Sequence, residues 1–382
     1  MKNRLNIQQF IEQHSDWEKL LSEKPYCLSI TKDVVCGQNL MMFKYSQIDS
    51  DMSLPLVKEC RGIVLNENTL DVVSCGFFKF FNYGEVNADD IDWSSCYCTE
   101  KLDGSLIKVV RIGNMLLVST NGTIDAYKAP IVEQIGCKAK NFGELFEEGL
   151  KHYGIDVESF KNMLDEGKTY MFELTSPFNK IVVQWHETKL NFIGVRDNSM
   201  FEEQFFKDNQ LSSIFDVPKI FMLRTVDECI DAASKLDCNA EGYVVVDSAF
   251  HRVKIKSPVY VSLHHMKNNG VLSFERGVEI VKSNELDEVL QYFPEFKEHL
   301  EKIRDDYNKM VADIESCWIK FLEEEDAGKF SSRKDQALYI TANFKKYSGV
   351  GFALLDKKYD SVKAWAAACP NKNIVKFLGY KE

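Results

Sequence analysis

The sequence lacks the patterns of several special protein classes. No apolar run approaches the ~20 residues that a membrane-spanning helix needs, and the polar residues 1–6 do not form the apolar core of a signal peptide. The eleven cysteines lack the paired spacing of a zinc site. We therefore expect a cytoplasmic protein with free thiols and no membrane partner.

Positive charge is also scarce. The chain has 47 Lys and Arg against 58 Asp and Glu, a formal net charge of −11. This balance argues against a protein that binds long duplexes through an extended basic surface. The deficit is uneven, because residues 258–382 carry 19 basic and 20 acidic side chains while residues 1–257 carry 28 and 38. A local basic groove is compatible with these counts.

A third absence concerns the order of helices and strands, which contains few βαβ alternations. Residues 1–24 have helical periodicity, β-like runs follow between about 27 and 82, and a hairpin is expected at 106–119. Residues 129–166 read as mostly helical. Strands are then expected at 169–174, 180–185, 189–196, 242–247 and 251–256, with a helix near 226–236. This order argues against a Rossmann-like sheet and predicts an α+β fold.

The pattern changes after Pro258, where helical periodicity takes over. Amphipathic stretches occupy 284–293, 295–324, 331–346 and 359–369. Because 382 residues exceed what one hydrophobic core usually serves, we expect two domains. The first would span residues 1–258, and the second would be an all-α domain at 259–382.

Lys101 occupies the most informative stretch, which runs from Glu100 to Ser105. Asp103 and Gly104 predict a tight turn, because glycine tolerates positive φ and aspartate bonds to nearby backbone amides. Such a turn between two strand-like runs would aim Lys101 into a pocket. The alternative is a solvated hairpin lysine, since Lys-x-Asp-Gly also occurs by chance.

Further charged motifs follow in order along the chain. Glu173 lies in an apolar strand-like segment, where an ionised group needs a partner. Glu241 and Gly242 open another apolar run. Lys254 and Lys256 alternate with apolar residues, so a strand would point both amines to one face, with Arg252 expected beside them. Together with Lys101, these residues predict a cavity that holds a phosphorylated ligand.

This ordered set resembles the motifs of the covalent nucleotidyltransferase superfamily, which includes ATP- and NAD-dependent ligases and mRNA capping enzymes. The narrower resemblance is to the first RNA ligase of T-even bacteriophages and its relatives. It rests on the segments Glu59-Cys60-Arg61-Gly62, Lys79-Phe80-Phe81-Asn82 and 254–264. It covers about residues 40–265 and implies a two-sheet nucleotidyltransferase (adenylation) domain with the nucleotide held between the sheets.

The resemblance also implies a role for each motif residue. Lys101 would be the catalytic nucleophile, and Lys254 and Lys256 would activate it and hold the α-phosphate. Glu241 and Glu173 would be the metal site for Mg²⁺ or Mn²⁺, a kind of ion that favours a few carboxylates plus phosphate oxygens. Glu241 would hold the ion directly or through water, and Glu173 would contact the ribose or a metal-bound water. The other nucleotide-binding positions would be Arg61, Lys79, Phe81, Glu100, Gly104 and Gly242. The alternatives are structural salt bridges for the glutamates, edge-strand lysines, and a core position for Phe81.

One segment departs from the family pattern. Members of the superfamily commonly carry a basic residue just before a glycine in the strand after the nucleophile. Residues 119–124 read Ser-Thr-Asn-Gly-Thr-Ile, with Asn121 before the glycine and no basic residue. One phosphate contact is therefore in question, and Lys128 is a candidate to replace it.

The resemblance implies an ATP-dependent RNA ligase of a bacteriophage-infected or bacterial cell. Such an enzyme joins 5′-phosphate and 3′-hydroxyl RNA ends through lysyl-AMP and RNA-adenylate intermediates. We expect a monomer whose helical domain selects a structured RNA such as a nicked tRNA. A capping guanylyltransferase or a DNA ligase is disfavoured, since each usually has an oligonucleotide-binding β-domain after the last lysine motif. A non-catalytic RNA-end-binding protein is the remaining alternative.

Overall fold

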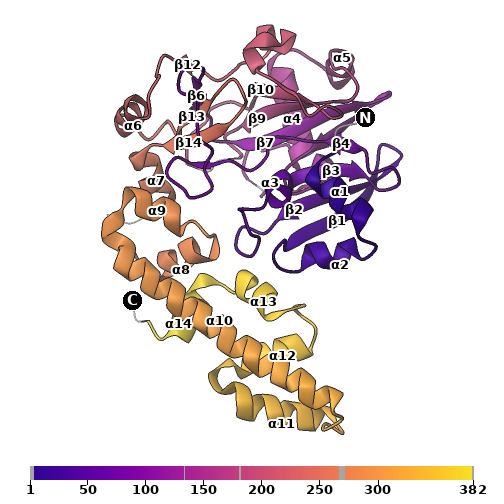
Figure 1. The fold of residues 1–382 in the computed structure, drawn as a ribbon, viewed down its shortest axis with the longest axis vertical. Helices are drawn as coiled ribbons and strands as arrows, with labels where there is room; N and C mark the ends of the chain where they lie inside the picture. The colour runs from indigo at the N-terminus through magenta and orange to yellow at the C-terminus, as the bar shows by residue number, and fades with distance from the viewer. Residues whose placement is uncertain (1–3, 133, 180–181, 266–271, 381–382) are drawn as a thin grey trace. The chain divides into compact units, whose positions relative to one another are not determined.

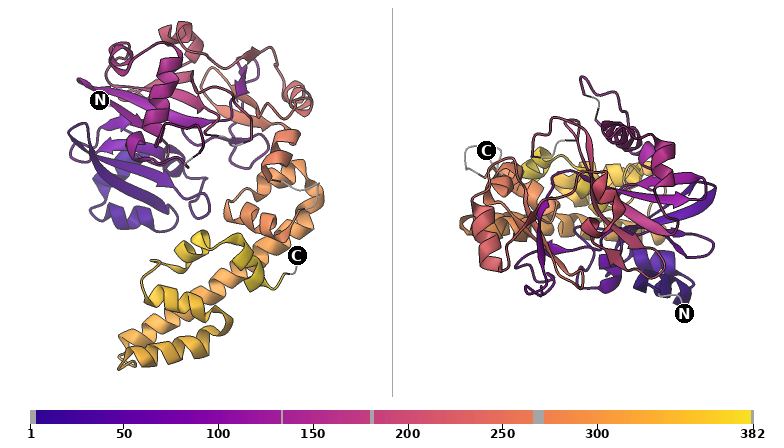
Figure 2. Two further views of the ribbon diagram at one scale, coloured as in Figure 1. Left: turned by 180° about the vertical axis from the view of Figure 1, so that it is seen from behind. Right: turned by 90° about the horizontal axis from the view of Figure 1, so that it is seen from above.

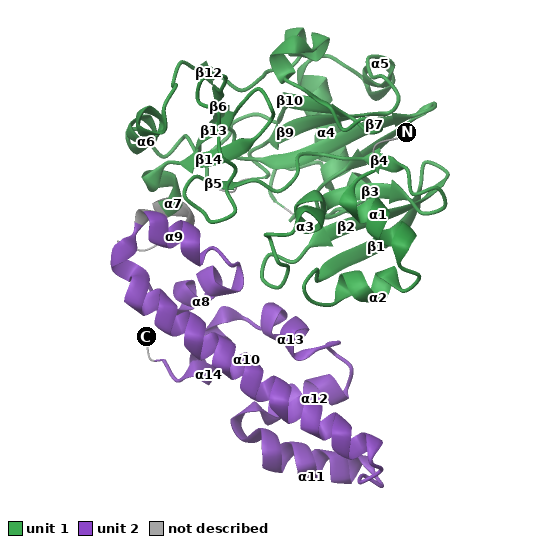
Figure 3. Ribbon diagram, in the orientation of Figure 1, with its two compact units in different colours: residues 1–264 green, residues 265–382 purple. Residues whose placement is uncertain are grey.

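The computed structural model describes residues 4–132, 134–179, 182–265 and 272–380. The chain forms two compact units, residues 1–264 and 265–382 (Figure 3). The unit boundary falls six residues after the domain boundary expected from the sequence, at the end of helix α7 (Pro258–His265). No helix in the described part of the chain is long and apolar enough to cross a membrane.

The first unit begins with a four-stranded antiparallel sheet of order β1-β2-β3-β4 (Figure 1). Its strands are β1 (Leu28–Val35), β2 (Gln38–Tyr45), β3 (Arg61–Asn66) and β4 (Val72–Ser74). Its helices are α1 (Asn6–Gln13), α2 (Trp17–Ser22) and α3 (Pro55–Glu59). The single helix expected at 1–24 is therefore two helices, because the polar residues Ser15 and Asp16 lie in a turn between them.

Two five-stranded sheets make up the rest of this unit. One has the order β11-β10-β9-β7-β8 and the other the order β12-β6-β13-β14-β5. Strands of the first are β7 (Ser105–Ile112), β8 (Met115–Ser119), β9 (Lys168–Thr175), β10 (Lys189–Asp197) and β11 (Glu203–Gln204). Strands of the second are β5 (Phe81–Asn82), β6 (Tyr97–Lys101), β12 (Ile220–Phe221), β13 (Gly242–Val246) and β14 (Arg252–Lys256). All pairs are antiparallel except β14 with β5.

Helices cover the outer sides of these two sheets. The helix α4 (Phe142–His152), the long magenta helix in Figure 2, packs against β10, and α5 (Val157–Asn162) packs on α4. The helix α6 (Val226–Ser234) packs against β13 and β14. Short 3₁₀ turns connect the elements at η1 (Ala126–Lys128), η2 (Phe206–Asp208) and η3 (Gln210–Ser213).

Two expectations about this unit need correction. Residues 129–141, expected to be largely helical, have no α-helix among those that the structure describes. The strand expected at 180–185 is absent from 182–185, while residues 180 and 181 lie outside the described residues. The backbone N–H groups of Val182 and Val183 donate to the Asp103 side chain instead of to a neighbouring strand. An apolar sequence run does not form a strand when its amides bond elsewhere.

The second unit is built of helices around one apolar core. They are α8 (Phe274–Lys282), α9 (Leu286–Tyr292), α10 (Lys297–Asp326), α11 (Arg333–Phe344), α12 (Ser348–Leu355), α13 (Val362–Ala368) and α14 (Asn371–Leu378), with 3₁₀ turns η4 (Pro294–Phe296) and η5 (Lys345–Tyr347). In α10 the buried Leu300, Ile303, Tyr307, Met310 and Ile314 recur at intervals of three or four, the spacing of one helix face. The α+β class with a helical C-terminal region is confirmed.

Candidate active site

A cavity of about 680 Å³ opens within the first unit, lined by residues of all three sheets. Lys101 lies at the end of β6 and lines it, as expected from the sequence. In the pairing of β6 with β13 and of β13 with β14, Lys101 lies opposite Gly242 and Gly242 opposite Lys256. The three positions therefore form one row across the sheet.

The turn after Lys101 is fixed by Asp103, which is 2% exposed. Its carboxylate accepts hydrogen bonds from the Val183 N–H at 2.7 Å and from the Tyr260 hydroxyl at 2.9 Å. Its backbone carbonyl accepts from Trp185 Nε1 at 2.7 Å. These bonds come from segments far along the chain, so the turn is held by tertiary contacts as well as by its own sequence.

Two glycines of the motifs are required by close packing. A Cβ on Gly104 would lie 2.5 Å from the Leu174 carbonyl oxygen. A Cβ on Gly242, where φ is +145°, would lie 2.2 Å from the Ile255 carbonyl oxygen. Both contacts are far shorter than a side chain tolerates. These glycines therefore allow neighbouring backbone segments to approach each other, and Gly104 also lines the cavity.

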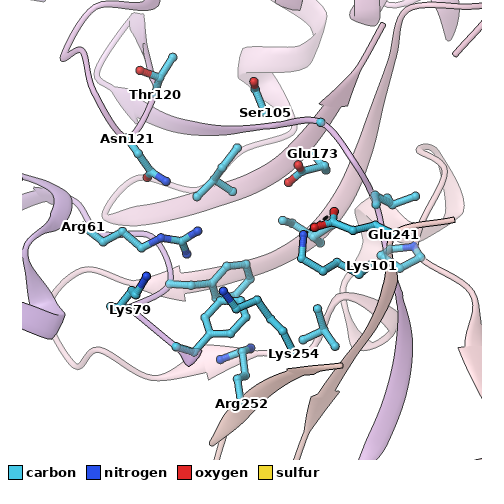
Figure 4. Close-up of a pocket in the computed structure, with 18 of the residues that line it drawn as sticks. Arg61, Lys79, Lys101, Ser105, Thr120, Asn121, Glu173, Glu241, Arg252 and Lys254 are labelled. Atoms are coloured by element: carbon cyan, nitrogen blue, oxygen red, sulfur yellow. Dashed lines mark ion pairs between the residues drawn. The ribbon is translucent and has the colours of Figure 1, made fainter. Parts of the chain in front are cut away.

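Glu241 connects two of the expected lysines. Its Oε2 lies 2.5 Å from Lys101 Nζ (Figure 4), and its Oε1 lies 3.7 Å from Lys256 Nζ. The Glu241 side chain is only 5% exposed, so the ion pair lies largely out of water. A charge in such a place needs a partner, and here each of the two amines supplies one.

Glu173 projects into the cavity from β9, beside this ion pair (Figure 4). Burial and the nearby Glu241 raise the pKa of Glu173 to about 7, although Lys101 and Arg61 act to lower it. Burial disfavours the charged carboxylate, and so does a second carboxylate. A cation beside Glu173 would therefore favour the ionised form of this carboxylate.

These carboxylates are the metal ligands that the sequence leads us to expect here. The described residues contain no cluster of three or more His, Cys, Asp or Glu side chains arranged to hold a metal. Two carboxylates nevertheless fit Mg²⁺, which commonly takes one or two carboxylates plus phosphate oxygens of the substrate. The donor set thus fits a metal that arrives with a nucleotide.

Cations line the opposite part of the cavity. Arg61, Lys79 and Lys254 all point into it (Figure 4). The Arg61 guanidinium lies 5.4 Å and the Lys254 amine 5.6 Å from the centre of the Phe80 ring. Such contacts place both cations over the negative face of one ring. The arrangement suits an anionic ligand with several phosphates.

Phe81 does not take the position that its motif implies. It is 6% exposed, lies in β5 and is absent from the cavity lining, where Phe77 and Phe80 stand instead. The amines of Lys58 and Lys79 each lie 5.3 Å from its ring centre, so Phe81 packs against cations in the core. Glu100 does line the cavity, and its N–H donates to the Lys219 carbonyl oxygen at 2.8 Å.

Residues 59–260, just over half of the chain, match the family described as RNA ligase. The chain belongs to the RNA ligase family.

Individual relatives of the family match different shares of their length. A protein of Autographa californica nuclear polyhedrosis virus, named by inference as a bifunctional polynucleotide kinase/RNA ligase, is 30% identical over 68% of this chain and 38% of its own length. The RNA ligase of Rhodothermus phage RM378 is 25% identical over 80% of this chain and 84% of its own. An archaeal ATP-dependent RNA ligase structure is 12% identical, with a TM-score of 0.47, over 81% of this chain and 83% of its own. The chain thus spans well under half the length of the viral relative.

Sequence reasoning missed a charged residue beneath the site of this RNA ligase family member. Lys108, on β7, is fully buried, and its amine donates to the Gly62 carbonyl oxygen. Burial lowers the pKa of Lys108 to about 7. Its position in an apolar strand-like run gives no sign of its role, because the Gly62 acceptor lies 46 residues away. Through that bond Lys108 supports the start of β3, which carries Arg61.

Arg252, expected on the same face as Lys254 and Lys256, lines the cavity with them. Its guanidinium lies 2.5 Å from Glu203 Oε2 and 4.4 Å from the centre of the Phe77 ring. Arg252 therefore forms an ion pair with Glu203, which lies in the other five-stranded sheet. Its backbone N–H donates to Asp89 Oδ2 at 3.1 Å, which fixes the start of β14.

Proposed function

We propose that this protein is an ATP-dependent RNA ligase that joins 5′-phosphate and 3′-hydroxyl ends in three nucleotidyl transfers. The observation that carries the proposal is Lys101 in the cavity, with Glu241 at 2.5 Å and the cations Lys254, Lys256 and Arg61 around it. Family membership supports the same interpretation. A lysine nucleophile, two carboxylates and a row of cations are what phosphoryl transfer needs.

In the first step the Lys101 amine would attack the α-phosphorus of ATP. A nitrogen–phosphorus bond forms, the bond to the β-phosphate oxygen breaks, and pyrophosphate leaves. The Lys101 ammonium first gives a proton to Glu241 Oε2, which lies within reach, and the attacking nitrogen releases a second proton to water as the nitrogen–phosphorus bond forms. Lys254 and Lys256 stabilise the negative charge that develops on the α-phosphate.

Mg²⁺ or Mn²⁺, held by Glu241 and Glu173, would neutralise phosphate charge in this step. The raised pKa of Glu173 is consistent with such a role, because a carboxylate without its own cation partner is costly when ionised. In the later steps AMP passes from Lys101 to the RNA 5′-phosphate, and the 3′-hydroxyl displaces AMP. Lys254 and Lys256 would stabilise the phosphate charge in both of these transfers as well.

The helical region would select the RNA, with a nicked tRNA as the proposed substrate. After β14 the described residues form helices and no β-barrel-like sheet. This favours a ligase over a capping guanylyltransferase, which usually carries an oligonucleotide-binding β-domain there. Double-stranded RNA, such as the stem of a hairpin, is recognised largely by shape, a task that a rigid helical surface can perform.

The test is to incubate the protein with ATP, GTP or NAD, each labelled in its nucleotidyl group, together with Mg²⁺. We expect a covalent adduct from ATP alone, followed by transfer of the label to a 5′-phosphorylated RNA and sealing of that RNA. Label from GTP alone would establish a capping enzyme. An adduct that passes to a DNA end but not to an RNA end would contradict the RNA substrate.

A further inference from the structure

A second cavity of about 430 Å³ adjoins the first. Tyr45, Arg61 and Asn121 line both cavities, so the two meet at these side chains. The second cavity is also lined by Lys44, and among the described residues that line it there is no carboxylate. Two cations with polar neighbours and no acid form surroundings suited to an anion.

Lys44 and Arg61 are arranged as a pair. They lie opposite each other in the pairing of β2 with β3, so their side chains leave the sheet on the same face. Two like charges directly opposite each other destabilise a sheet unless an anion lies between them. Within the described residues, Lys44 makes no ion pair that would offset this repulsion. The pair therefore suits a bound anion.

A buried donor of Arg61 points to the same conclusion. Arg61 Nη1 is buried and has no hydrogen-bond partner among the described residues, so this N–H group can donate to an anion. A buried polar atom without a partner is costly, and in native structures it usually has a ligand, a water or an ion. A Cβ on Gly122 would lie 3.6 Å from Lys44 Nζ, so the amine reaches the loop that carries Asn121.

Lys128, the sequence-based candidate for a missing phosphate contact, does not reach this place. Its amine lies 2.6 Å from Asp33 Oδ2, and it lines neither cavity. Lys44 instead brings a positive charge to the Asn121 loop from a different strand. The positive charge that family members carry in the strand after the nucleophile is thus supplied here by Lys44 on β2.

We propose that Lys44, together with Arg61, binds the terminal phosphates of ATP, which leave as pyrophosphate. This inference rests on the function proposed above. Arg61 faces the cavity across from Lys101 (Figure 4), so a triphosphate whose α-phosphate lies at Lys101 extends toward Arg61 and the second cavity. Lys44 is a substrate-binding residue in this arrangement and takes no part in the later steps, because the terminal phosphates of ATP have left by then.

The first experiment measures lysyl-AMP formation without RNA over a range of ATP concentrations. Replacing Lys44 with Met should raise the ATP concentration for half-maximal rate about 10- to 100-fold, the effect of one charged hydrogen bond. Lys44→Arg should restore most of the loss. The matched control is Lys32→Met on β1, which removes an exposed lysine that pairs with Glu18 at 2.6 Å.

The second measurement uses RNA that already carries a 5′-adenylate. The wild type and all three variants should seal it equally, because that step involves no terminal phosphates. Impaired sealing of this RNA by Lys44→Met, with unchanged dependence on ATP in the first step, would assign the phosphate to the RNA and overturn the proposal. Unchanged kinetics in both assays would also overturn it.

The third measurement is independent of catalysis and separates failure of this inference from failure of the proposed function. Calorimetric titration with tripolyphosphate should show at least about tenfold weaker binding to Lys44→Met than to the wild type or Lys32→Met. Equal binding overturns the role of Lys44 even if the wild type forms lysyl-AMP. If the wild type forms no adduct, the proposed function fails, but the titration still shows whether Lys44 contributes to binding an anion.

Discussion

The two units of the protein differ in how they bury charge. In the first unit many charged side chains are buried, namely Glu59, Asp103, Lys108, Lys161, Arg196, Glu241, Asp247 and Arg252. In the described part of the second unit Glu288 alone is buried, and the core is otherwise apolar. Burying a charge costs folding free energy unless it is well partnered. The first unit therefore relies on many partnered buried charges, whereas the described core of the second unit is held by apolar packing.

Two carboxylates of the first unit show what decides whether a buried carboxylate is ionised. Burial alone would raise the pKa of Glu203, but Arg252 and Arg196 on either side lower it below its ordinary value. Burial raises the pKa of Glu173 to about 7, since the lowering by Lys101 and Arg61 does not offset it. The neighbours of a carboxylate, more than its depth, make it structural or reactive.

The largest expected effect concerns Lys101. Replacing it with Ala or Arg should reduce the AMP adduct by more than about 10³-fold, because the other lysines that line the cavity lie at the expected phosphate-binding positions and not at the Asp103–Gly104 turn. Sealing of RNA that already carries a 5′-adenylate should survive in part, since that step forms no new lysyl-AMP. Adduct yield is measured on denaturing gels, with Lys128→Ala as the control. An adduct that persists on another lysine would refute Lys101 as the nucleophile. The buried charges of the first unit would then no longer be explained by a site built around Lys101.

An intermediate effect is expected from Lys108. Burial holds its pKa at about 7, below the 10.5 of a free lysine. Between these values the unfolded chain binds a proton that the folded protein does not, so this residue makes stability rise with pH by at most about 1.4 kcal/mol per pH unit. Below about pH 7 the folded protein bears the full cost of the buried charge. Replacing Lys108 with Met removes this dependence.

The measurement is urea unfolding of the wild type and Lys108→Met at about pH 6, 8 and 10, which span the window between the two pKa values. We expect the variant to gain most relative to the wild type at the lowest pH, by a few kcal/mol, and to lose this advantage at the highest. There the loss of the bond to the Gly62 carbonyl, worth about 1 kcal/mol, should dominate. Lys32→Met serves as the exposed control. A stability difference independent of pH would mean that Lys108 is not buried with a perturbed proton affinity.

The smallest effect is expected from removing residues 266–382. Every nucleotide-site motif lies before Ser257, so lysyl-AMP formation should change by no more than a few-fold. The preference for a broken tRNA stem-loop over an unstructured strand should fall much further, because contacts that read shape decide which RNA is joined. Adduct yield and ligation of the two RNAs are compared, with circular dichroism to confirm folding. A folded truncation that forms no adduct, or that keeps the full stem-loop preference, would contradict this division between the units.

Much of the fold and of the candidate site follows from short-range patterns in the sequence. The turn at Asp103 and Gly104, the alternation of Lys254 and Lys256, and the periodicity of α10 each depend on a few neighbouring residues. Such signals come directly from the periods of strands and helices and from turn geometry. The sequence by itself therefore determined the α+β class and the turn after Lys101, which aims this side chain into a cavity.

The tertiary structure alone decided which distant groups meet. Phe80, and not Phe81, faces the cavity because β5 pairs with β14, and the residues at 182–185 form no strand because Asp103 takes their amides. The Lys108–Gly62 bond and the Lys44–Arg61 pair likewise join positions 17 to 46 residues apart. A periodic pattern states which face a side chain occupies but carries no information about what lies opposite. That choice depends on strand pairing and on how the polar groups of the whole unit satisfy one another.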